Sequence, residues 1–282
     1  MINESLVAEL RKFLTPEQLL LEEPMSSHTT FRIGGPADYL IFPSSLPQLR
    51  QIFQLLRAYE VPFLFMDAGG TLNDITTFSH EFGHYLDGYL NYNADETVDL
   101  AECFSQAMEL LMLTRLDDVL TEKELDSLYQ IKMGDILGMY VQQGAFAEFE
   151  HVIYGAKPEE LSVDFLNSAF LQAAQDYGFA EEGFEDLYSM FWMDITHFFE
   201  QPFYVITYPV SHDIAMQIFQ LEQAQPGQGM EKYLEMLDRD YADMLDTALN
   251  AGLESPFDEA CLRTVCAAAD KWLDEYDMTG IE

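Results

Sequence analysis

The sequence predicts a mainly α-helical protein with a small β-sheet, preceded by a short α/β segment of different origin. Between residues 110 and 191, apolar side chains recur at steps of three and four residues, the spacing by which a helix buries one face. Residues 28–43 instead place β-forming side chains on both sides of a Gly-Gly-Pro turn. These patterns predict two domains, spanning residues 1–60 and residues 61–282.

The length and the charge of the chain limit its partners. At 282 residues, it can form one large or two smaller domains with a substantial core. Its 50 Asp and Glu outnumber its 13 Lys and Arg, which gives a formal net charge of -37. Because such a surface repels phosphate backbones and anionic lipids, we expect no nucleic-acid partner and no membrane partner. An acidic wall could attract basic peptides, but a solvated acidic surface explains the same composition.

Signals for secretion are absent from the sequence. It contains no run of eighteen apolar residues. The first twenty residues carry several charges, among them Glu4, Glu9, Arg11 and Lys12. Three cysteines are an odd and sparse set, which is typical of reduced thiols and not of a disulfide framework. We therefore expect a cytoplasmic protein, and the sequence leaves its oligomeric state open.

The N-terminal segment is expected to contain a short helix, two extended stretches and a second helix. Its order, with the sequence TTFRIGGPAD at residues 29–38, resembles the opening of the flavin-dependent UDP-N-acetylenolpyruvoylglucosamine reductases. The resemblance covers about forty residues and implies an FAD-binding, UDP-N-acetylmuramate dehydrogenase-like fragment. It ends before residues 67–74, where those reductases have a glycine-rich, asparagine-containing loop for the flavin pyrophosphate and this chain has DAGGTLND. In a simpler interpretation, Gly34 and Gly35 only form a turn.

The stretch TFSHEFGH, at residues 77–84, contains the motif H-E-x-x-H. Four residues are slightly more than one helical turn, so His80 and His84 project from the same face of a helix and can share a metal ion. Two neutral imidazoles suit zinc, and Glu81, which need not bind the ion, can take a proton from water that the ion activates. A partly exposed amphipathic helix that carries these residues by chance is the alternative interpretation.

From about residue 62 onward, the chain resembles the C-terminal half of the zinc oligopeptidases of the thimet oligopeptidase and oligoendopeptidase F family. The resemblance begins with residues 63–66 and the GGTLND turn at residues 69–74, and it covers about 215 residues. It implies a zincin-like metallopeptidase catalytic domain with one Zn²⁺ per chain. It also implies a strand before the metal helix that pairs with an extended peptide substrate.

The helix that carries the two histidines is expected to run to about Leu90. Asn73 or Asp74 is its expected N-cap. Its expected packing face consists of Phe78, Phe82, Tyr85, Leu86 and Tyr89.

The same resemblance places the third metal ligand on a second helix. Residues 102–109 match the family's E-x-x-S-Q-x-x-E segment, so Glu102 is expected to complete a site of two histidines and one glutamate. Glu109, two turns further along, is expected to orient a ligand histidine as an outer hydrogen-bond acceptor. The competing carboxylates lack these neighbours, and they are Asp95, Glu96 and Asp99.

Residues 197–208 resemble the family's H-F-x-x-x-F-Y-V-x-x-Y stretch, with one extra residue after the histidine. The resemblance implies that a histidine and one or more tyrosines lie over the metal. Such donors, held in a dry site, would stabilise the negative charge that develops on the carbonyl oxygen during hydrolysis. We assign this role first to Tyr208, with Tyr204 and His197 in support. In the alternative interpretation, these residues are ordinary buried aromatics.

Together these resemblances predict a zinc-dependent metalloendopeptidase that hydrolyses internal bonds of short peptides, with Glu81 as general base. Full-length relatives are about twice as long as the matching part, so their N-terminal half is expected to be missing here and cleavage to be impaired. An inactive zinc-binding remnant and the FAD-binding fragment are the alternative functions.

Overall fold

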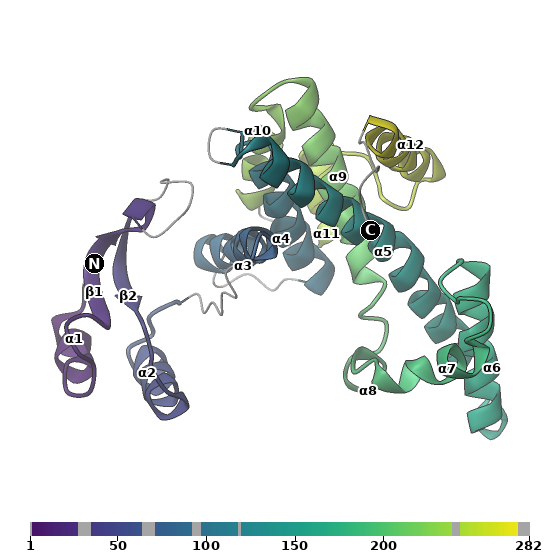
Figure 1. Ribbon diagram of the computed structural model, residues 1–282, viewed down its shortest axis with the longest axis horizontal. Coiled ribbons are helices and arrows are strands. Elements are labelled where there is room, and N and C mark those ends of the chain that lie inside the picture. Colours follow the sequence, from purple (N-terminus) through teal and green to yellow (C-terminus); the bar gives the residue numbers. More distant parts are fainter. Residues whose placement is uncertain are drawn as a thin grey trace. The chain divides into compact units, whose positions relative to one another are not determined.

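The computed structural model describes residues 2–27, 35–63, 71–91, 97–117, 120–238 and 243–275. The chain forms two compact units, Met1–Asp67 with Leu116–Thr121, and Ala68–Arg115 with Glu122–Glu282. Both units are drawn in Figure 1, and their elements confirm the predicted mainly helical fold with a small sheet. Within the described part of the chain, no helix has the length and apolar character that crossing a membrane requires.

The first unit contains, in chain order, α1 (Glu4–Leu10), β1 (Leu19–Pro24), the 3₁₀ turn η1 (Met25–Ser27), β2 (Pro36–Ile41) and α2 (Leu46–Ala58). The strands pair antiparallel, with Leu19 opposite Ile41. Asn3 caps α1 with its side chain, and Ser45 caps α2. The core of this unit is made by Leu6, Val7, Leu10, Leu14, Leu19, Ile52 and Leu56. Most of the TTFRIGGPAD stretch, residues 29–34, lies outside the described residues.

The second unit is helical in its described residues. Its helices are α3 (Asn73–Leu90), α4 (Val98–Leu113), α5 (Glu122–Gly155), α6 (Val163–Asp176), α7 (Glu185–Met190), α8 (His197–Glu200), α9 (Thr207–Ala224), α10 (Gln228–Leu237), α11 (Met244–Asn250) and α12 (Glu259–Glu275), with 3₁₀ turns η2 (Pro158–Glu160) and η3 (Phe191–Asp194).

Helix α4 lies at the centre of this unit, between α3 and α9 (Figure 1). It is apolar on most of its surface and is buried along nearly its whole length, as expected of a helix without a solvent-facing stripe. The polar side chains of Glu102, Ser105 and Gln106 are therefore buried with it. Buried polar groups need hydrogen-bond partners. The Ser105 hydroxyl donates to Glu102 within α4, and Nδ1 of His212, on α9, lies 3.0 Å from Oε1 of Gln106.

Helix α5 carries a second core near its C-terminal end, where it packs on α6. Phe146 and Phe149 from α5 meet Phe170 from α6 there, with ring centroids 5.2 to 5.7 Å apart. Trp192 and Phe198 pack against the same cluster. This core supports the segment that leads from α8 to α9.

The face of α3 that packs on α4 is made of small and polar side chains. Its buried residues are Thr76, Ser79, Gly83 and Asp87, one at each turn. The expected aromatic face is stacked along the other side of the helix and is half-buried or exposed, with Tyr89 59% exposed. The prediction of an aromatic packing face is therefore wrong, because close packing on α4 leaves no room for rings.

Helix α3 begins at Asn73, which makes Leu72 its N-cap, a residue without a side-chain capping bond. The predicted caps, Asn73 and Asp74, are thus wrong by one or two positions. Asp74 accepts a hydrogen bond from the N–H of Thr71 at 2.6 Å, and its charge lies where the helix dipole favours it. The strand expected before the metal helix falls on residues 61–66, of which residues 61–63 are described and are not in a strand, while residues 64–66 lie outside the described residues, as do Gly69 and Gly70.

Candidate metal centre

Helix α3 places His80 and His84 one turn apart on the same face. Their ring centroids are 4.8 Å apart and the two rings are nearly perpendicular. The Nε2 atoms approach to 3.2 Å, so both point to one spot beside the helix. Each ring is partly exposed, which leaves this spot open to solvent from one side.

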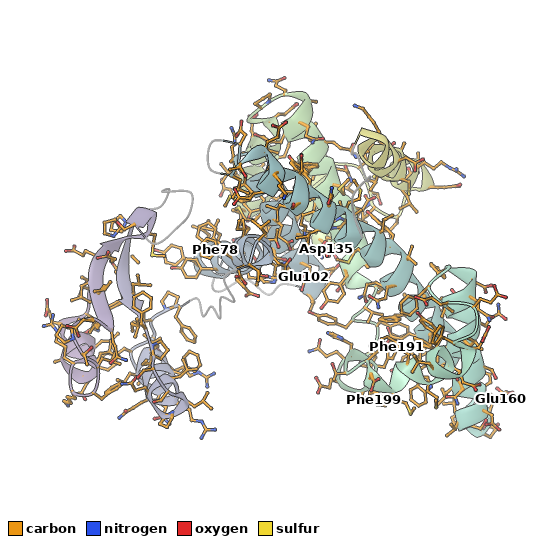
Figure 2. The ribbon with its side chains drawn as sticks, viewed as in Figure 1. Phe78, Glu102, Asp135, Glu160, Phe191 and Phe199 are labelled. Carbon is orange, nitrogen blue, oxygen red and sulfur yellow. The ribbon has the colours of Figure 1, made fainter. Side chains whose placement is uncertain are left out.

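Helix α4 brings Glu102 to the same spot. Its Oε2 lies 3.7 Å from Nε2 of His80, and its Oε1 lies 4.0 Å from Nε2 of His84. The Glu102 residue is only 5% exposed, and the Ser105 hydroxyl donates to its Oε2 at 3.2 Å. Figure 2 shows Glu102 on α4 next to α3. The carboxylate is therefore held in one orientation and faces both imidazoles.

Gly83 permits this approach of the two helices. A Cβ atom at this position would lie 2.6 Å from the Cα of Ser105, and closer still to the carbonyl oxygen of Phe104. No side chain fits between helices at such distances, since real Cβ contacts are about 3.5 Å or longer. The glycine inside the H-E-F-G-H sequence thus lets α3 and α4 pack closely enough for three ligand side chains to meet.

The three side chains fit a zinc ion. Among the described residues, His80, His84 and Glu102 form a group of potential ligands whose ligand atoms all lie within 4.8 Å of one another. Tetrahedral zinc with bonds of 2.0–2.2 Å separates its ligand atoms by roughly 3.3–3.6 Å. The separation of 3.2 Å between the two Nε2 atoms is close to that range, and the separations of 3.7 and 4.0 Å, which lead to the two different oxygens of Glu102, are somewhat longer. Two imidazole nitrogens and one carboxylate are also a ligand set that zinc prefers in catalytic sites.

A second layer supports the first histidine. Nδ1 of His80 lies 2.5 Å from Oε1 of Glu109, which is the partner expected for it from the sequence. Donation of the Nδ1 proton to this carboxylate leaves Nε2 with a free electron pair toward Glu102, the tautomer that a metal requires. The other oxygen of Glu109, Oε2, accepts from Nζ of Lys132 at 2.5 Å.

The two imidazoles have pKa values that shift in opposite directions. Burial, followed by the neighbouring His80, lowers the pKa of His84. Burial alone would lower the pKa of His80 as well, but the hydrogen bond and the charge of Glu109, with Glu102 and Glu81, raise it overall. His84 is therefore neutral near pH 7, whereas a metal ion must compete with a proton for His80.

Tyrosines approach the centre from the segment after α8. Tyr204 donates from its hydroxyl to Oε1 of Glu102 at 3.3 Å. The ring of Tyr208, at the start of α9, lies 5.3 Å from that of Tyr204, and the ring of His197 stacks on Tyr204 at 4.7 Å. Burial is the largest cause that raises the pKa of both phenols, so each keeps its proton at neutral pH and can donate it.

A strained residue positions this segment. Phe203 has a φ of +60°, a left-handed conformation that costs a bulky residue roughly 1–3 kcal/mol. Its N–H donates to Oε1 of the buried Glu150, on α5, at 2.8 Å. Its ring also packs on Tyr154, with centroids 4.7 Å apart. Glu150 thus stabilises the turn that brings Tyr204 to Glu102.

The remaining predicted residues are placed as follows. Glu81 is half-buried beside the histidines, and its charge acts on both imidazoles. Of the competing carboxylates, Asp95 and Glu96 lie outside the described residues. Asp99 lies in the first turn of α4, and its side chain is not part of the metal-ligand group.

Comparison with known proteins identifies the family. Residues 33–265, most of the chain, match the profile of Peptidase family M3. The chain belongs to this family of peptidases. The match also includes both helices that carry the candidate metal ligands.

Solved structures share the fold of this M3 chain. PZ peptidase A has a TM-score of 0.68 at 21% sequence identity, and the superposition covers 79% of this chain and 41% of that one. Oligoendopeptidase-F from Enterococcus faecium has a TM-score of 0.59 at 21% identity, covering 73% of this chain and 39% of that one. The M3 chain thus spans about two fifths of the solved chains that it resembles.

Curated relatives match a shorter segment. The UDP-N-acetylenolpyruvoylglucosamine reductase of Alkaliphilus metalliredigens is 38% identical over 72 residues, which are 26% of this chain and 24% of the reductase. The reductase of Caldanaerobacter subterraneus is 42% identical over 69 residues, 24% of this chain and 23% of the reductase. The predicted resemblance to both families is confirmed, and the chain spans about a quarter of these reductases.

Three supporting residues of the M3 chain were not predicted from its sequence. Gly83 could have been predicted to lie at a close contact between helices, because a glycine inside a helix often marks close packing. Lys132 interrupts an apolar stripe of α5, which was a weaker sign of a buried charge. Glu150 had no signal in the sequence, since its role depends on the distant backbone of Phe203.

Proposed function

We propose that this M3 chain is a zinc-dependent metalloendopeptidase that hydrolyses internal bonds of short peptides. The observation that supports it best is the convergence of His80, His84 and Glu102 from two helices, with ligand atoms that all lie within 4.8 Å of one another. Family membership supports peptidase chemistry. The metal, the reaction and the substrate class are our proposal.

Each residue of the site has a role in this proposal. His80, His84 and Glu102 would hold the ion, which when bound supplies Lewis acidity toward the scissile carbonyl and makes water more acidic. Glu81 stands beside these ligands without joining them, so it takes a proton from the attacking water and passes it to the leaving amine. Glu109 keeps the His80 ring in the binding orientation through the Nδ1 hydrogen bond.

The two tyrosines would have different tasks. Because the hydroxyl of Tyr204 bonds to Glu102, we assign to it the orientation of that carboxylate. Tyr208 then donates to the oxygen that becomes negative as the carbonyl is attacked. The raised pKa of Tyr208 keeps this proton in place over the whole physiological pH range. His197 supports both through its stacking on Tyr204.

A zinc-binding chain without peptidase activity is the second candidate. The chain covers about two fifths of the solved peptidase chains. Large apolar side chains are also exposed on the segment that follows α6, among them Phe184, Leu187, Met193 and Phe199. The FAD-binding alternative is not favoured, because the reductase relatives match only about a quarter of the chain.

Metal analysis followed by a cleavage assay tests the proposal. The wild-type chain should contain about one zinc, which Glu102→Ala and His84→Ala should lose. Asp99→Asn, which neutralises a carboxylate one turn away on α4, should keep it. Glu81→Gln should retain zinc but lose cleavage of a quenched fluorescent peptide.

The outcomes separate the candidates. A chain that binds zinc and cleaves the peptide, with cleavage abolished by chelators, supports the peptidase. A chain that binds zinc but does not cleave the peptide supports the zinc-binding protein without peptidase activity. A wild-type chain that binds no zinc from a saturating solution would overturn both.

A further inference from the structure

A buried lysine lies behind the candidate metal centre. Lys132, on α5, is 6% exposed, and among the described residues it is the only lysine or arginine that is buried. Burial of an ammonium group is costly unless it is paired and hydrogen-bonded. Two carboxylates provide this pairing, Glu109 with Oε2 at 2.5 Å from Nζ and Asp135 with Oδ2 at 3.0 Å.

These contacts connect Lys132 to a ligand histidine. Glu109 uses its two oxygens for different partners, Oε1 for Nδ1 of His80 and Oε2 for Nζ of Lys132. Because a carboxylate is planar, occupation of both oxygens prevents it from rotating about its terminal bond. Lys132 thereby determines where the acceptor for His80 lies. Asp135, the other partner of Lys132, lies on α5 as Lys132 does, and it is labelled in Figure 2.

The charges of the three groups agree with this geometry. Burial alone would raise the pKa of Glu109, but its hydrogen bond to His80 and the charge of Lys132 lower it overall. Burial likewise opposes the charge of Lys132, and Glu109 and Asp135 outweigh it, so that its pKa is raised. The pair is thus an ammonium and a carboxylate under ordinary conditions.

We propose that Lys132 is a positioning residue of the zinc centre, acting through Glu109 to hold the His80 ring in its metal-binding orientation. The inference rests on the proposed function, since it concerns the same ion. The hydrogen-bond partners of Lys132 are Glu109 and Asp135, and Lys132 lies on a helix that supplies none of the three metal ligands.

Two roles of Lys132 predict opposite effects on zinc affinity. If the lysine acted only through its charge, its removal would relieve repulsion of Zn²⁺ and tighten binding. If it positions Glu109, its removal loosens the acceptor of His80 and weakens binding. Loss of an outer partner of a metal-bound histidine typically weakens binding by about 10–100-fold.

Zinc dissociation constants, measured by competition with a chromophoric chelator, test this role. Lys132→Met should bind zinc about tenfold more weakly than the wild type. Lys132→Arg, which keeps the charge and N–H donors, should bind more tightly than Lys132→Met. Lys232→Met, which removes the same charge from a partly exposed position on α10, should bind like the wild type.

A double variant shows whether the effect passes through Glu109. Glu109→Gln alone should weaken zinc binding, and addition of Lys132→Met to it should cause little further loss. Circular dichroism of each metal-free variant checks that it is folded. Lys132→Gln, which keeps a polar donor, replaces the methionine variant where that one does not fold.

The results distinguish this inference from the proposed function. A wild type without zinc refutes the proposed function itself. A wild type that binds zinc, with Lys132→Met binding equally well or better, refutes only the positioning role. If Lys132→Met weakens zinc binding equally in the wild type and in the Glu109→Gln variant, the positioning role is refuted as well, because the lysine would then act by another route.

Discussion

Gly83→Ala is expected to separate α3 from α4 and to weaken both folding and zinc binding. The new methyl carbon would lie 2.6 Å from the Cα of Ser105, where about 3.5 Å is needed, so the helices must move apart by roughly 1 Å. Overpacking typically costs about 1–3 kcal/mol, and contact with backbone atoms places the cost near the upper end. The better helix propensity of alanine offsets about 1 kcal/mol of it. The expected net loss is about 2 kcal/mol of unfolding free energy.

Gly88→Ala is the matched control, because it lies in the same helix and its added Cβ would meet no atom within 4 Å. It should be neutral or more stable by up to about 1 kcal/mol. Urea unfolding of the metal-free proteins measures the stabilities, and chelator competition measures zinc affinity. Because ligand distances must hold to about 0.2 Å, Gly83→Ala should bind zinc at least tenfold more weakly. If both alanine variants behaved alike in both assays, the close approach of α3 and α4 at Gly83 would be refuted.

Substitutions at three further positions test the surroundings of the site. Glu150→Ala removes the acceptor of the strained Phe203 N–H and should cost about 2 kcal/mol of unfolding free energy, measured by urea unfolding. Glu150→Gln keeps an acceptor and should cost less. Equal losses in the two variants would contradict the role of Glu150 as that acceptor. Tyr208→Phe should retain zinc and lower kcat of peptide cleavage by about 10²–10³, and an unchanged kcat would exclude it as the oxyanion donor. Burial foremost lowers the pKa of His212 to about 4, so the unfolded chain takes up this proton first as pH falls below 6.5. This His212 contribution to stability is therefore lost as the pH falls from 6.5 to 4, and the loss between pH 7 and pH 5 is about 2 kcal/mol of unfolding free energy. The variant His212→Asn should reduce the pH dependence of the unfolding free energy by that amount. An identical pH dependence in the wild type and the variant would contradict this prediction.

The sequence predicts the members of the candidate site better than their surroundings. His80 and His84 are related by one turn of one helix, and Glu102 and Glu109 by two turns of another, so local periodicity places each pair on one face. The structure brings these four side chains together. Their roles stay a prediction until metal binding is measured.

The face by which α3 packs could not be obtained from its hydrophobic pattern. The aromatic residues of this helix give the larger apolar stripe, which normally marks the buried side. Here the buried side is set by distance, since the small residues around Gly83 allow a backbone approach that rings would prevent. The approach of Glu102 to the two histidines therefore depends on the small residues of α3 and not on its aromatic residues.

The supports of the site depend on contacts between residues far apart in the chain. Lys132 reaches Glu109 across 23 positions, and Glu150 reaches Phe203 across 53. No periodic pattern relates such positions, and each becomes visible only when α5 is placed beside its neighbours. Both residues are acids or bases buried on the same long helix, whose remaining buried side chains are mostly apolar. Since an unpaired buried charge is costly, a buried Lys or Glu on an otherwise apolar helix face predicts a distant polar partner, even where the sequence does not show which one.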